Sequence, residues 1–302
     1  MNMDQIRCVL IVARCGSFTE ASFQSNLSQS SISKKIASLE KELGVALFDR
    51  TTRTVRATLA GEEFVRHGRE ILHQYNLLRK GMRSYARPRD RLVVGSIYFA
   101  PDQGLASCIA KFTTEYPAIE IETVYDTTSP LMEGLLGGDI DVAIVSSMYP
   151  SDCIGSPPNF AADSRFVSSS LDVSPYYLVV GERHPLAGRK VVDYRDLRGE
   201  KLITLDKNMD VYHKAVDGVF EKEGFRPDIV VQSGSIQEAL VLVSKNIGVA
   251  IFSPKVASGF EGVRLIELRR PLLRDTQIVV RDTRRISDSV RLFYEYVKLN
   301  YR

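Results

Sequence analysis

The apolar residues in the first 25 positions recur at helical spacing in two short stretches. The first stretch places them three or four positions apart, at Ile6, Val9, Leu10 and Ala13, which indicates one buried helix face. Gly16 ends this helix, because glycine reaches the left-handed conformation of a helix C-cap without strain. Ser17 and Glu20 form a Ser-x-x-Glu capping box, so a second helix is predicted from Phe18 to about Ser25.

A third helix is predicted after a turn of three residues, 26–28. Ser28 is a favourable N-cap for it, and Gly44 is a favourable C-cap. Between these two residues an apolar stripe predicts a buried face, formed by Ile32, Ile36, Leu39 and Leu43. Two helices joined by so short a turn are typical of a helix-turn-helix.

The opposite face of the third helix carries small and basic side chains, namely Gln29, Ser30, Ser33, Lys34, Ala37 and Lys41. Small side chains let a helix approach the major groove of DNA closely, and basic ones contact bases or phosphates there. A solvent-exposed helix without any partner has a similar face. The segment that follows therefore decides between the two interpretations.

That segment predicts a short basic hairpin. Residues 47–56 read Leu-Phe-Asp-Arg-Thr-Thr-Arg-Thr-Val-Arg, which are two β-prone pieces around a Thr-Arg tip. Arg50, Arg53 and Arg56 are each able to reach a phosphate, a contact that positions a protein on DNA without reading its sequence. A basic hairpin beside a helix-turn-helix favours a winged DNA-binding domain.

From Thr58 onward the chain again has helical spacing, now with a 3.5-residue period. The repeat runs over three heptads through Phe64, Gly68, Ile71, Tyr75, Leu78, Met82 and Tyr85. It is typical of a coiled-coil seam, and it stops just before Pro88. The alternative is a helix packed on its own domain. The strict register favours a partner helix, so we expect a dimer that places two third helices on one duplex.

Residues 91–302 alternate strand and helix patterns, as expected of an α/β domain. Strands are predicted at 92–97, 119–125, 141–146, 176–180, 201–204, 228–232, 248–252 and 276–280, and helices at 105–116, from 129, and near 209–223, 235–245 and 287–300. The segment from Ser147 to Ser174 is rich in Ser, Pro and Gly. It is therefore predicted to be a long loop and crossover.

The N-terminal motifs together resemble the LysR-type transcriptional regulators. The resemblance rests on 16–21 (Gly-Ser-Phe-Thr-Glu-Ala), 28–33, 39–44 (Leu-Glu-Lys-Glu-Leu-Gly), 47–50, Arg53 and 58–61, and it departs at Ser25, Ser30, Ser31 and Ala57. It implies DNA contacts from Ser28, Gln29, Ser30, Ser31, Ser33, Lys34, Arg50 and Arg53. Gln29, Ser30, Ser33 and Lys34 are expected nearest the bases, and Arg50 and Arg53 on phosphate.

The resemblance continues, more weakly, at 116–117 (Tyr-Pro), 138–144 (Gly-Asp-Ile-Asp-Val-Ala-Ile), 184–187 (His-Pro-Leu-Ala) and 248–250 (Gly-Val-Ala). These motifs are similar to the family's effector domain, which implies two lobes like those of a type 2 periplasmic binding protein. The lobes would be joined by two crossover strands and would hold a small-molecule effector between them. The resemblance also implies a tetramer.

The predicted fold class is thus a multidomain α+β protein in three parts. A winged helix-turn-helix is expected at 1–58, a dimerising linker helix and hinge at 59–90, and a two-lobed α/β effector domain at 91–302. The first lobe is expected at about 91–165 and 269–302, and the second lobe at about 166–268.

Polar and aromatic side chains gather where the predicted strands end, and ligands of open α/β sheets bind beyond the carboxyl ends of strands. The candidate effector-binding residues are Ser96, Tyr98, Phe99, Thr127, Thr128, Ser129, Ser146 and Thr204. Hydroxyls beside helix N-termini suit a carboxylate or similar anion. Asp126 opposes an anion and favours an effector with an amine or several hydroxyls, so both classes stay open.

Charge and composition agree with this organisation. Residues 1–90 hold 15 Lys and Arg against nine Asp and Glu, whereas residues 91–302 hold 25 against 28, which favours a polyanionic partner for the first part. With 44% hydrophobic and 25% charged residues, the composition is that of an ordinary globular protein. No apolar run reaches the ~18 residues of a membrane span, so no membrane partner is expected. The four cysteines include no Cys-x-x-Cys pair and form no disulfide framework, which favours a reduced, cytoplasmic protein.

No catalytic or metal-binding motif accompanies these features. The sequence lacks a Gly-x-Ser-x-Gly elbow, a phosphate loop and a His-Glu-x-x-His pair, so no catalytic residue, metal or cofactor is predicted. Two alternatives stay open. One is a cytoplasmic solute-binding or catalytic α/β protein whose N-terminal module serves assembly. The other is a redox sensor that uses Cys153, the one cysteine expected as an exposed thiol.

The favoured function is sequence-specific, DNA-binding control of transcription. A small-molecule effector between the two lobes is expected to modulate DNA binding or activation. The expected partners are double-stranded DNA, further copies of this chain and RNA polymerase.

Overall fold

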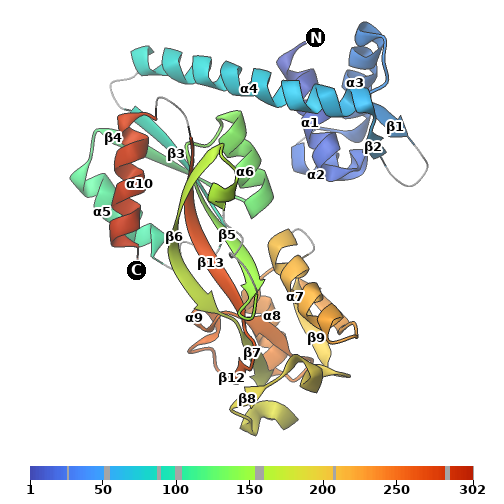
Figure 1. Ribbon diagram of the computed structural model, residues 1–302, viewed down its shortest axis with the longest axis vertical. Coiled ribbons are helices and arrows are strands. Elements are labelled where there is room, and N and C mark those ends of the chain that lie inside the picture. The colour runs from blue at the N-terminus through green and yellow to red at the C-terminus, as the bar shows by residue number, and fades with distance from the viewer. Residues whose placement is uncertain are drawn as a thin grey trace. The chain divides into compact units, whose positions relative to one another are not determined.

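The computed structural model describes residues 1–25, 27–50, 55–86, 90–98, 104–153, 160–206, 209–282 and 286–301. The chain forms two compact units, Met1–Pro88 with Leu136–Asp139, and Arg89–Leu135 with Ile140–Arg302. Figure 1 shows their helices and strands. Among the described residues, no helix is both long enough and apolar enough to cross a membrane.

The first unit contains three short helices, a two-stranded wing and a long helix. These are α1 (Met3–Cys15), α2 (Phe18–Ser25), α3 (Gln29–Leu43), β1 (Phe48–Arg50), β2 (Val55–Ala57) and α4 (Leu59–Ala86). The predicted caps are confirmed. Ser17 Oγ accepts a hydrogen bond from the Glu20 N–H at 3.3 Å, and Ser28 Oγ accepts one from the Ser31 N–H at 3.2 Å. Asn26 of the predicted turn lies outside the described residues.

The three short helices share one hydrophobic core. Ile32, Ile36 and Leu39 of α3 are fully buried, as predicted, and they pack with Val9 and Val12 of α1. The stripe is one residue shorter than predicted, because Leu43 is exposed in the last turn of α3, where the helix leaves the core.

The wing and α4 are fixed to this core by close backbone contacts. The Val55 N–H donates to the carbonyl of Gly16 at 3.3 Å, and the Thr58 N–H donates to the carbonyl of Leu47 at 3.0 Å. A Cβ atom at Gly61 would lie 2.0 Å from the Leu47 carbonyl oxygen. Only glycine therefore lets the start of α4 approach β1 so closely.

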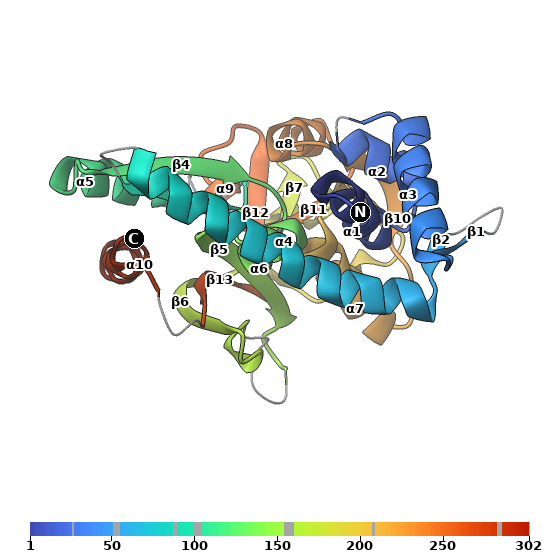
Figure 2. The same ribbon diagram turned by 90° about the horizontal axis from the view of Figure 1, so that it is seen from above.

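The predicted seam on α4 divides into two parts. Its first part packs against the unit's own core, because Phe64 contacts that core and Gly68 faces Ile6. Farther along, Ile71, Leu78 and Met82 are exposed, Leu78 to 61%. Figure 2 shows α4 as one continuous helix that extends beyond α1–α3. The exposed apolar part of the seam is thus available to a partner helix.

The second unit is built on a five-stranded sheet in the order β4-β3-β5-β13-β6. Its strands are β3 (Asp90–Ser96), β4 (Ile119–Tyr125), β5 (Val142–Pro150), β6 (Phe166–Pro175) and β13 (Leu272–Arg281), and its helices are α5 (Leu105–Glu115), α6 (Thr128–Gly137), η2 (Phe160–Ala162) and α10 (Asp288–Asn300). β3 runs parallel to β4 and β5, and β13 runs antiparallel to β5 and β6. This is the first lobe.

The second lobe has a four-stranded sheet in the order β11-β7-β12-β8 and a parallel pair, β9 and β10. Its elements are β7 (Tyr177–Gly181), η3 (Pro185–Gly188), β8 (Val191–Val192), η4 (Tyr194–Leu197), β9 (Lys201–Leu205), α7 (Asp210–Lys222), β10 (Asp228–Ser233), α8 (Ile236–Ser244), β11 (Ala250–Phe252), α9 (Pro254–Ala257) and β12 (Val263–Leu268). Leu178, Val179, Ile251 and Phe252 are buried in its core.

The prediction of a long loop at 147–174 is wrong at both ends. β5 continues to Pro150, and β6 is a ten-residue strand. The serines of β6 are compatible with a strand because they pair with polar partners on β13: Ser170 Oγ donates to Asp275 Oδ1 at 2.6 Å. Polar cross-strand pairs stabilise a sheet without an apolar alternation.

The position of β6 also corrects the predicted start of the second lobe at about 166. β6 pairs with β13 from Phe166 to Pro175, so it belongs to the first lobe's sheet, and the chain enters the second lobe after Pro175. It returns between β12 and β13. β5, β13 and β6 lie side by side as long strands in Figure 1.

Candidate functional site

The candidate DNA-binding face is the N-terminal half of α3. Ser28, Gln29, Ser30 and Lys34 are exposed, and Ser31 and Ser33 are half-buried. Ser28 Oγ lies 3.1 Å from Ser30 Oγ, and Thr19 Oγ1 of α2 donates to Gln29 Oε1 at 3.4 Å. The face is therefore polar and free of large apolar groups, as close approach to a groove requires.

The predicted basic wing is present as the β1–β2 hairpin, in which Asp49 lies opposite Arg56. Arg56 is exposed. Arg50 is the last residue of β1, and the predicted contact Arg53 belongs to residues 51–54, which lie outside the described residues. The anchored strands project this hairpin from the same core that carries α3.

A pocket of about 460 Å³, part of it open to solvent, lies in the second unit between its two lobes. It is lined by Ile97, Tyr98, Asp126, Thr127, Thr128, Ser146, Met148, Tyr176, Leu205, Met209, Val211, Tyr212 and Arg274. The first-lobe residues come from the carboxyl ends of β3, β4 and β5, where parallel strands of an open sheet place their ligands. The remaining wall comes from β9, α7, β13 and the crossover at Tyr176.

Four of the eight predicted effector residues line this pocket, namely Tyr98, Thr127, Thr128 and Ser146. Ser96 is buried and donates to the backbone carbonyl of the next residue at 3.1 Å. Thr204 is also buried, because side chains alternate along β9 and its neighbour Leu205 takes the pocket side. Ser129 is exposed, and Phe99 lies outside the described residues.

Hydrogen bonds fix the polar wall of the pocket. Thr128 Oγ1 donates to the backbone carbonyl of Ser146 at 3.3 Å and lies 3.4 Å from the Ser146 N–H. Asp126 Oδ1 accepts from the Thr127 N–H at 2.7 Å. Burial and the nearby Asp126 raise the pKa of Tyr98, so its hydroxyl stays neutral at physiological pH.

The pocket residues that sequence reasoning missed come mainly from the second lobe and from β13. Tyr212 is buried, and its hydroxyl donates to the carbonyl of Ile251 at 3.2 Å; burial raises its pKa. Tyr176 begins the second lobe. Arg274 lies two residues before the predicted strand 276–280, between Leu273 and Asp275, and no local pattern identifies it as a pocket residue.

Arg274 is an unusual residue in this pocket. Its exposed fraction is 2%, and its Nε and Nη2 atoms are buried without a hydrogen-bond partner among the described residues. Its guanidinium carbon lies 5.9 Å from the centre of the Tyr176 ring. A buried guanidinium ordinarily forms an ion pair and hydrogen bonds.

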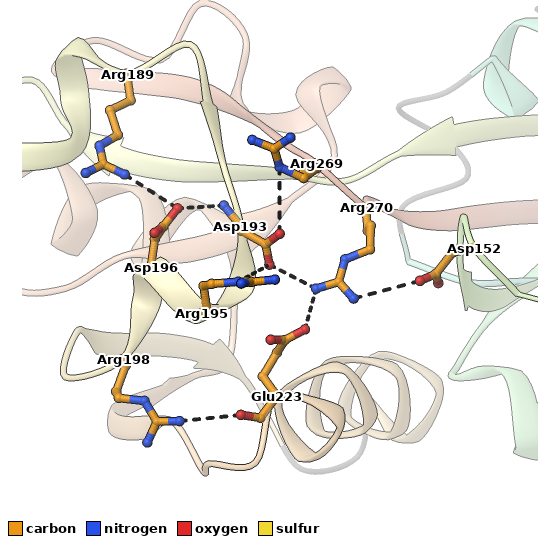
Figure 3. A network of polar contacts seen from close by, with 9 residues as sticks. All are labelled: Asp152, Arg189, Asp193, Arg195, Asp196, Arg198, Glu223, Arg269 and Arg270. Atoms are coloured by element: carbon orange, nitrogen blue, oxygen red, sulfur yellow. Dashed lines mark hydrogen bonds and ion pairs between the residues drawn. The ribbon is translucent and has the colours of Figure 1, made fainter.

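Arg270, four residues earlier, shows that ordinary arrangement. Figure 3 shows it in a network of carboxylates and arginines. Arg270 Nη2 contacts Glu223 and lies 2.9 Å from Asp193 Oδ1, and Arg270 Nη1 lies 3.9 Å from Asp152 Oδ2. Its hydrogen bonds to Glu223 and Asp193 raise the pKa of Arg270. Burial raises the pKa of Asp193, but Arg270 outweighs that effect and lowers it. The network ties η4, the end of α7 and the crossover together.

The four cysteines are all free, and only Cys153 is exposed. Burial raises the pKa values of the Cys8 and Cys108 thiols, which opposes thiolate chemistry. Within the described ranges, no group of three or more His, Cys, Asp or Glu side chains is placed to hold a metal ion.

Both units match families of known proteins. Residues 3–62 match the bacterial regulatory helix-turn-helix protein of the lysR family, and residues 86–301 match the LysR substrate binding domain. The HTH-type transcriptional regulator AlsR of Bacillus subtilis (strain 168) is 30% identical over 260 residues, which cover 85% of this chain and 82% of AlsR. The transcriptional dual regulator GltC of the same organism is 27% identical over 310 residues, covering 98% and 96%.

Solved structures show the same fold. HinK, a LysR family transcriptional regulator from Pseudomonas aeruginosa, superposes with a TM-score of 0.56 at 24% identity, covering 99% of this chain and 97% of HinK. The predicted fold class is confirmed. Because the substrate-binding-domain match spans more than half of the residues, this chain belongs to the LysR family of bacterial transcriptional regulators.

Proposed function

We propose that this regulator binds operator DNA as a dimer and that an effector in the inter-lobe pocket changes that binding. The observation that carries the proposal is the polar, small-residue face of α3 beside a basic wing. Ser28, Gln29, Ser30, Ser31, Ser33 and Lys34 would enter the major groove, with Gln29, Ser30, Ser33 and Lys34 nearest the bases. Arg50 and Arg53 would hold phosphates.

The exposed part of the α4 seam supports the dimer. Ile71, Leu78 and Met82 recur on one side of a helix and are exposed in the single chain. Pairing with a second α4 would remove them from water, which is the main driving force for helix association. Two α3 helices would then meet successive major grooves of a two-fold operator. We further propose a tetramer, as expected from the family.

Effector control requires that the effector binds one arrangement of the two lobes more tightly than another. A pocket with walls from both lobes meets this requirement, because a ligand that contacts both walls favours their closed arrangement. We propose a cytoplasmic protein that acts without a catalytic residue, metal or cofactor and contacts RNA polymerase at its promoters.

The test is binding of the purified full chain to a labelled duplex from its own upstream region and to a random duplex, each titrated with salt. We expect sequence-preferring binding with a steep salt dependence. Lys34→Ala should reduce the preference for the specific duplex by about 1–3 kcal/mol. Equal, weak binding of wild type to both duplexes under all effector conditions would contradict the proposal.

Lys35→Ala is the matched control for Lys34→Ala. Lys35 is the next residue on α3, but its Nζ lies 3.1 Å from Asp4 Oδ2 of α1, so it faces the protein instead of the DNA. Lys35→Ala should leave the sequence preference unchanged. Arg53→Ala should weaken binding to both duplexes alike and lower the salt slope by about 1.

A further inference from the structure

We infer that the effector is a small organic acid and that Arg274 binds its carboxylate. The inference rests on the proposed function of the pocket as the effector site, and it names the chemical class of ligand. Three observations carry it: the missing counter-charge of Arg274, the apolar walls around it and the position of Asp126.

The first observation concerns charge. Arginine keeps its proton in proteins, so Arg274, a residue with an exposed fraction of 2%, carries a permanent positive charge. Its Nε and Nη2 atoms are buried without a hydrogen-bond partner in the part of the chain that the structure describes. A buried charge without a partner costs several kcal/mol. An anion in the pocket removes that cost.

The neighbours of Arg274 on the sheet do not supply the counter-charge. Arg274 lies opposite Met148 of β5 and Ser174 of β6, and Ser174 Oγ is itself buried without a partner. Asp275 is next in sequence, but side chains alternate along a strand, and its carboxylate accepts hydrogen bonds from Ser170 and Gln277 on the other face. The guanidinium is therefore left for a ligand.

The second observation concerns the rest of the ligand. The pocket that Arg274 lines is also walled by Met148, Tyr176, Leu205 and Met209, which offer apolar surface and an aromatic ring. A bare inorganic ion would leave this surface in contact with water. An organic acid with an apolar or aromatic body would instead bury it, which is favourable by about 25 cal/mol per Å², while two parallel N–H donors of the guanidinium hold the carboxylate.

The third observation is Asp126, which lines the same pocket without forming an ion pair to Arg274. Its negative charge repels a carboxylate, so the carboxylate lies toward Arg274 and away from the hydroxyls beside Asp126. A hydroxyl or amine on the same ligand would donate a hydrogen bond to the Asp126 carboxylate. The two effector classes that the sequence left open are thus combined in one molecule, a hydroxy or amino acid in the broad chemical sense.

The experiment measures binding of a matched probe set to the full chain in a buffer without phosphate or sulfate. The probes are 4-hydroxybenzoate and benzoate, the neutral 4-hydroxybenzamide, the cation benzylamine, and inorganic phosphate. Titration calorimetry gives the dissociation constants for wild type, Arg274→Met, Arg274→Lys and the control Arg264→Met, whose arginine is exposed and pairs with Glu182. The melting temperature of each ligand-free variant is measured in parallel.

We expect both carboxylates to bind wild type at least tenfold more tightly than the amide. Arg274→Met should lose about tenfold to hundredfold in carboxylate affinity, Arg274→Lys should lose less, and Arg264→Met should match wild type. Equal affinity for the acid and the amide, an unchanged affinity in Arg274→Met, or binding of phosphate alone would overturn the inference.

If none of the probes binds, the ligand-free melting temperatures decide. An unpaired buried charge predicts that Arg274→Met melts at or above the wild-type temperature. A fall of several degrees would mean that the protein itself pairs Arg274, which overturns the inference. Failure of the proposed function is distinguishable: Arg274-dependent carboxylate binding without any effect on DNA binding would leave the anion site in place and remove only its regulatory role.

Discussion

Arg270 and Arg274 lie four residues apart at the junction of the lobes, and their surroundings are opposite. Arg270 contacts Glu223, Asp193 and Asp152 and is 34% exposed in its side chain. Arg274 is 2% exposed and has no such contact among the described residues. The more exposed arginine thus has the carboxylates, and the more buried one has none.

This difference separates a structural role from a binding role. The network around Arg270 is satisfied within the chain, so it stabilises the junction and has no capacity left for a ligand. The pocket around Arg274 holds a charge that the chain does not neutralise, so its stability improves when an anion binds. Charge and residue type alone do not distinguish the two arginines, whereas burial and hydrogen-bond partners do.

The largest expected effect is the contrast between the two methionine variants. Arg270→Met removes the cation that Glu223 contacts and the shortest ion pair of Asp193, and it should lower the free energy of unfolding by about 2 kcal/mol after allowance for solvent screening. Arg274→Met should leave it unchanged or raise it, because no partner is lost and an uncompensated buried charge is removed. Urea midpoints of the two variants, measured without ligand, check this. Equal losses of unfolding free energy in the two variants would contradict the proposed difference between the two arginines.

A smaller effect concerns pH. Because Arg270 lowers the pKa of Asp193 below its unfolded value of 3.8, the ionised Asp193 stabilises the fold above that pH, and the contribution is lost as pH falls through the lower folded value. Asp193→Asn should therefore flatten the acid limb of the melting-temperature profile below about pH 4. A profile identical to that of wild type would show that the network contributes nothing at acid pH.

Tyr212→Phe should lower the free energy of unfolding by about 1 kcal/mol, because it removes the hydrogen bond that the buried hydroxyl donates to the Ile251 carbonyl at 3.2 Å. Tyr176→Phe is the matched control, since no hydrogen bond of the Tyr176 hydroxyl is found in the described ranges. Its ligand-free stability should stay within about 0.5 kcal/mol of wild type. The same urea midpoints separate the two tyrosines.

Thr128→Val should lower the free energy of unfolding by only about 0.5 kcal/mol. The effect is small because the contacts of Thr128 Oγ1 with the Ser146 backbone are long, at 3.3 and 3.4 Å. The variant places a methyl group where a hydroxyl lines the pocket. It should therefore reduce the rise in melting temperature that a bound effector causes. A rise equal to that of wild type would remove Thr128 from the binding wall.

The helices of the first unit could be predicted because their signals are local. Caps at Ser17 and Ser28 and the stripe through Ile32 and Leu39 lie within a few residues of the structure they specify. β6 could not be predicted in this way, because its serines are stabilised by β13 residues about a hundred positions away. β12 was missed because Val263–Leu268 does not alternate strictly: its two exposed residues, Arg264 and Glu267, are three positions apart, so a period-two signal is lacking.

The same distinction between local signals and long-range contacts applies to the residues of the pocket. Tyr98, Thr128 and Ser146 follow strands whose carboxyl ends could be located from the sequence. Tyr176, Tyr212 and Arg274 reach the pocket only because the chain crosses twice between the lobes, and no local pattern specifies which second-lobe residues then face the first. The polar wall could therefore be predicted from the sequence, whereas Arg274, the residue on which the inferred class of effector rests, could not.

The central claim is that an anion at Arg274 controls DNA binding, and fluorescence anisotropy of a labelled operator duplex tests it most directly. The affinities of wild type and Arg274→Met would be measured at one salt concentration, without 4-hydroxybenzoate and with it at a concentration that saturates wild type but not Arg274→Met. The account predicts a 5- to 150-fold change for wild type, the usual range of allosteric coupling, and no change for Arg274→Met. The same change in both proteins would contradict it.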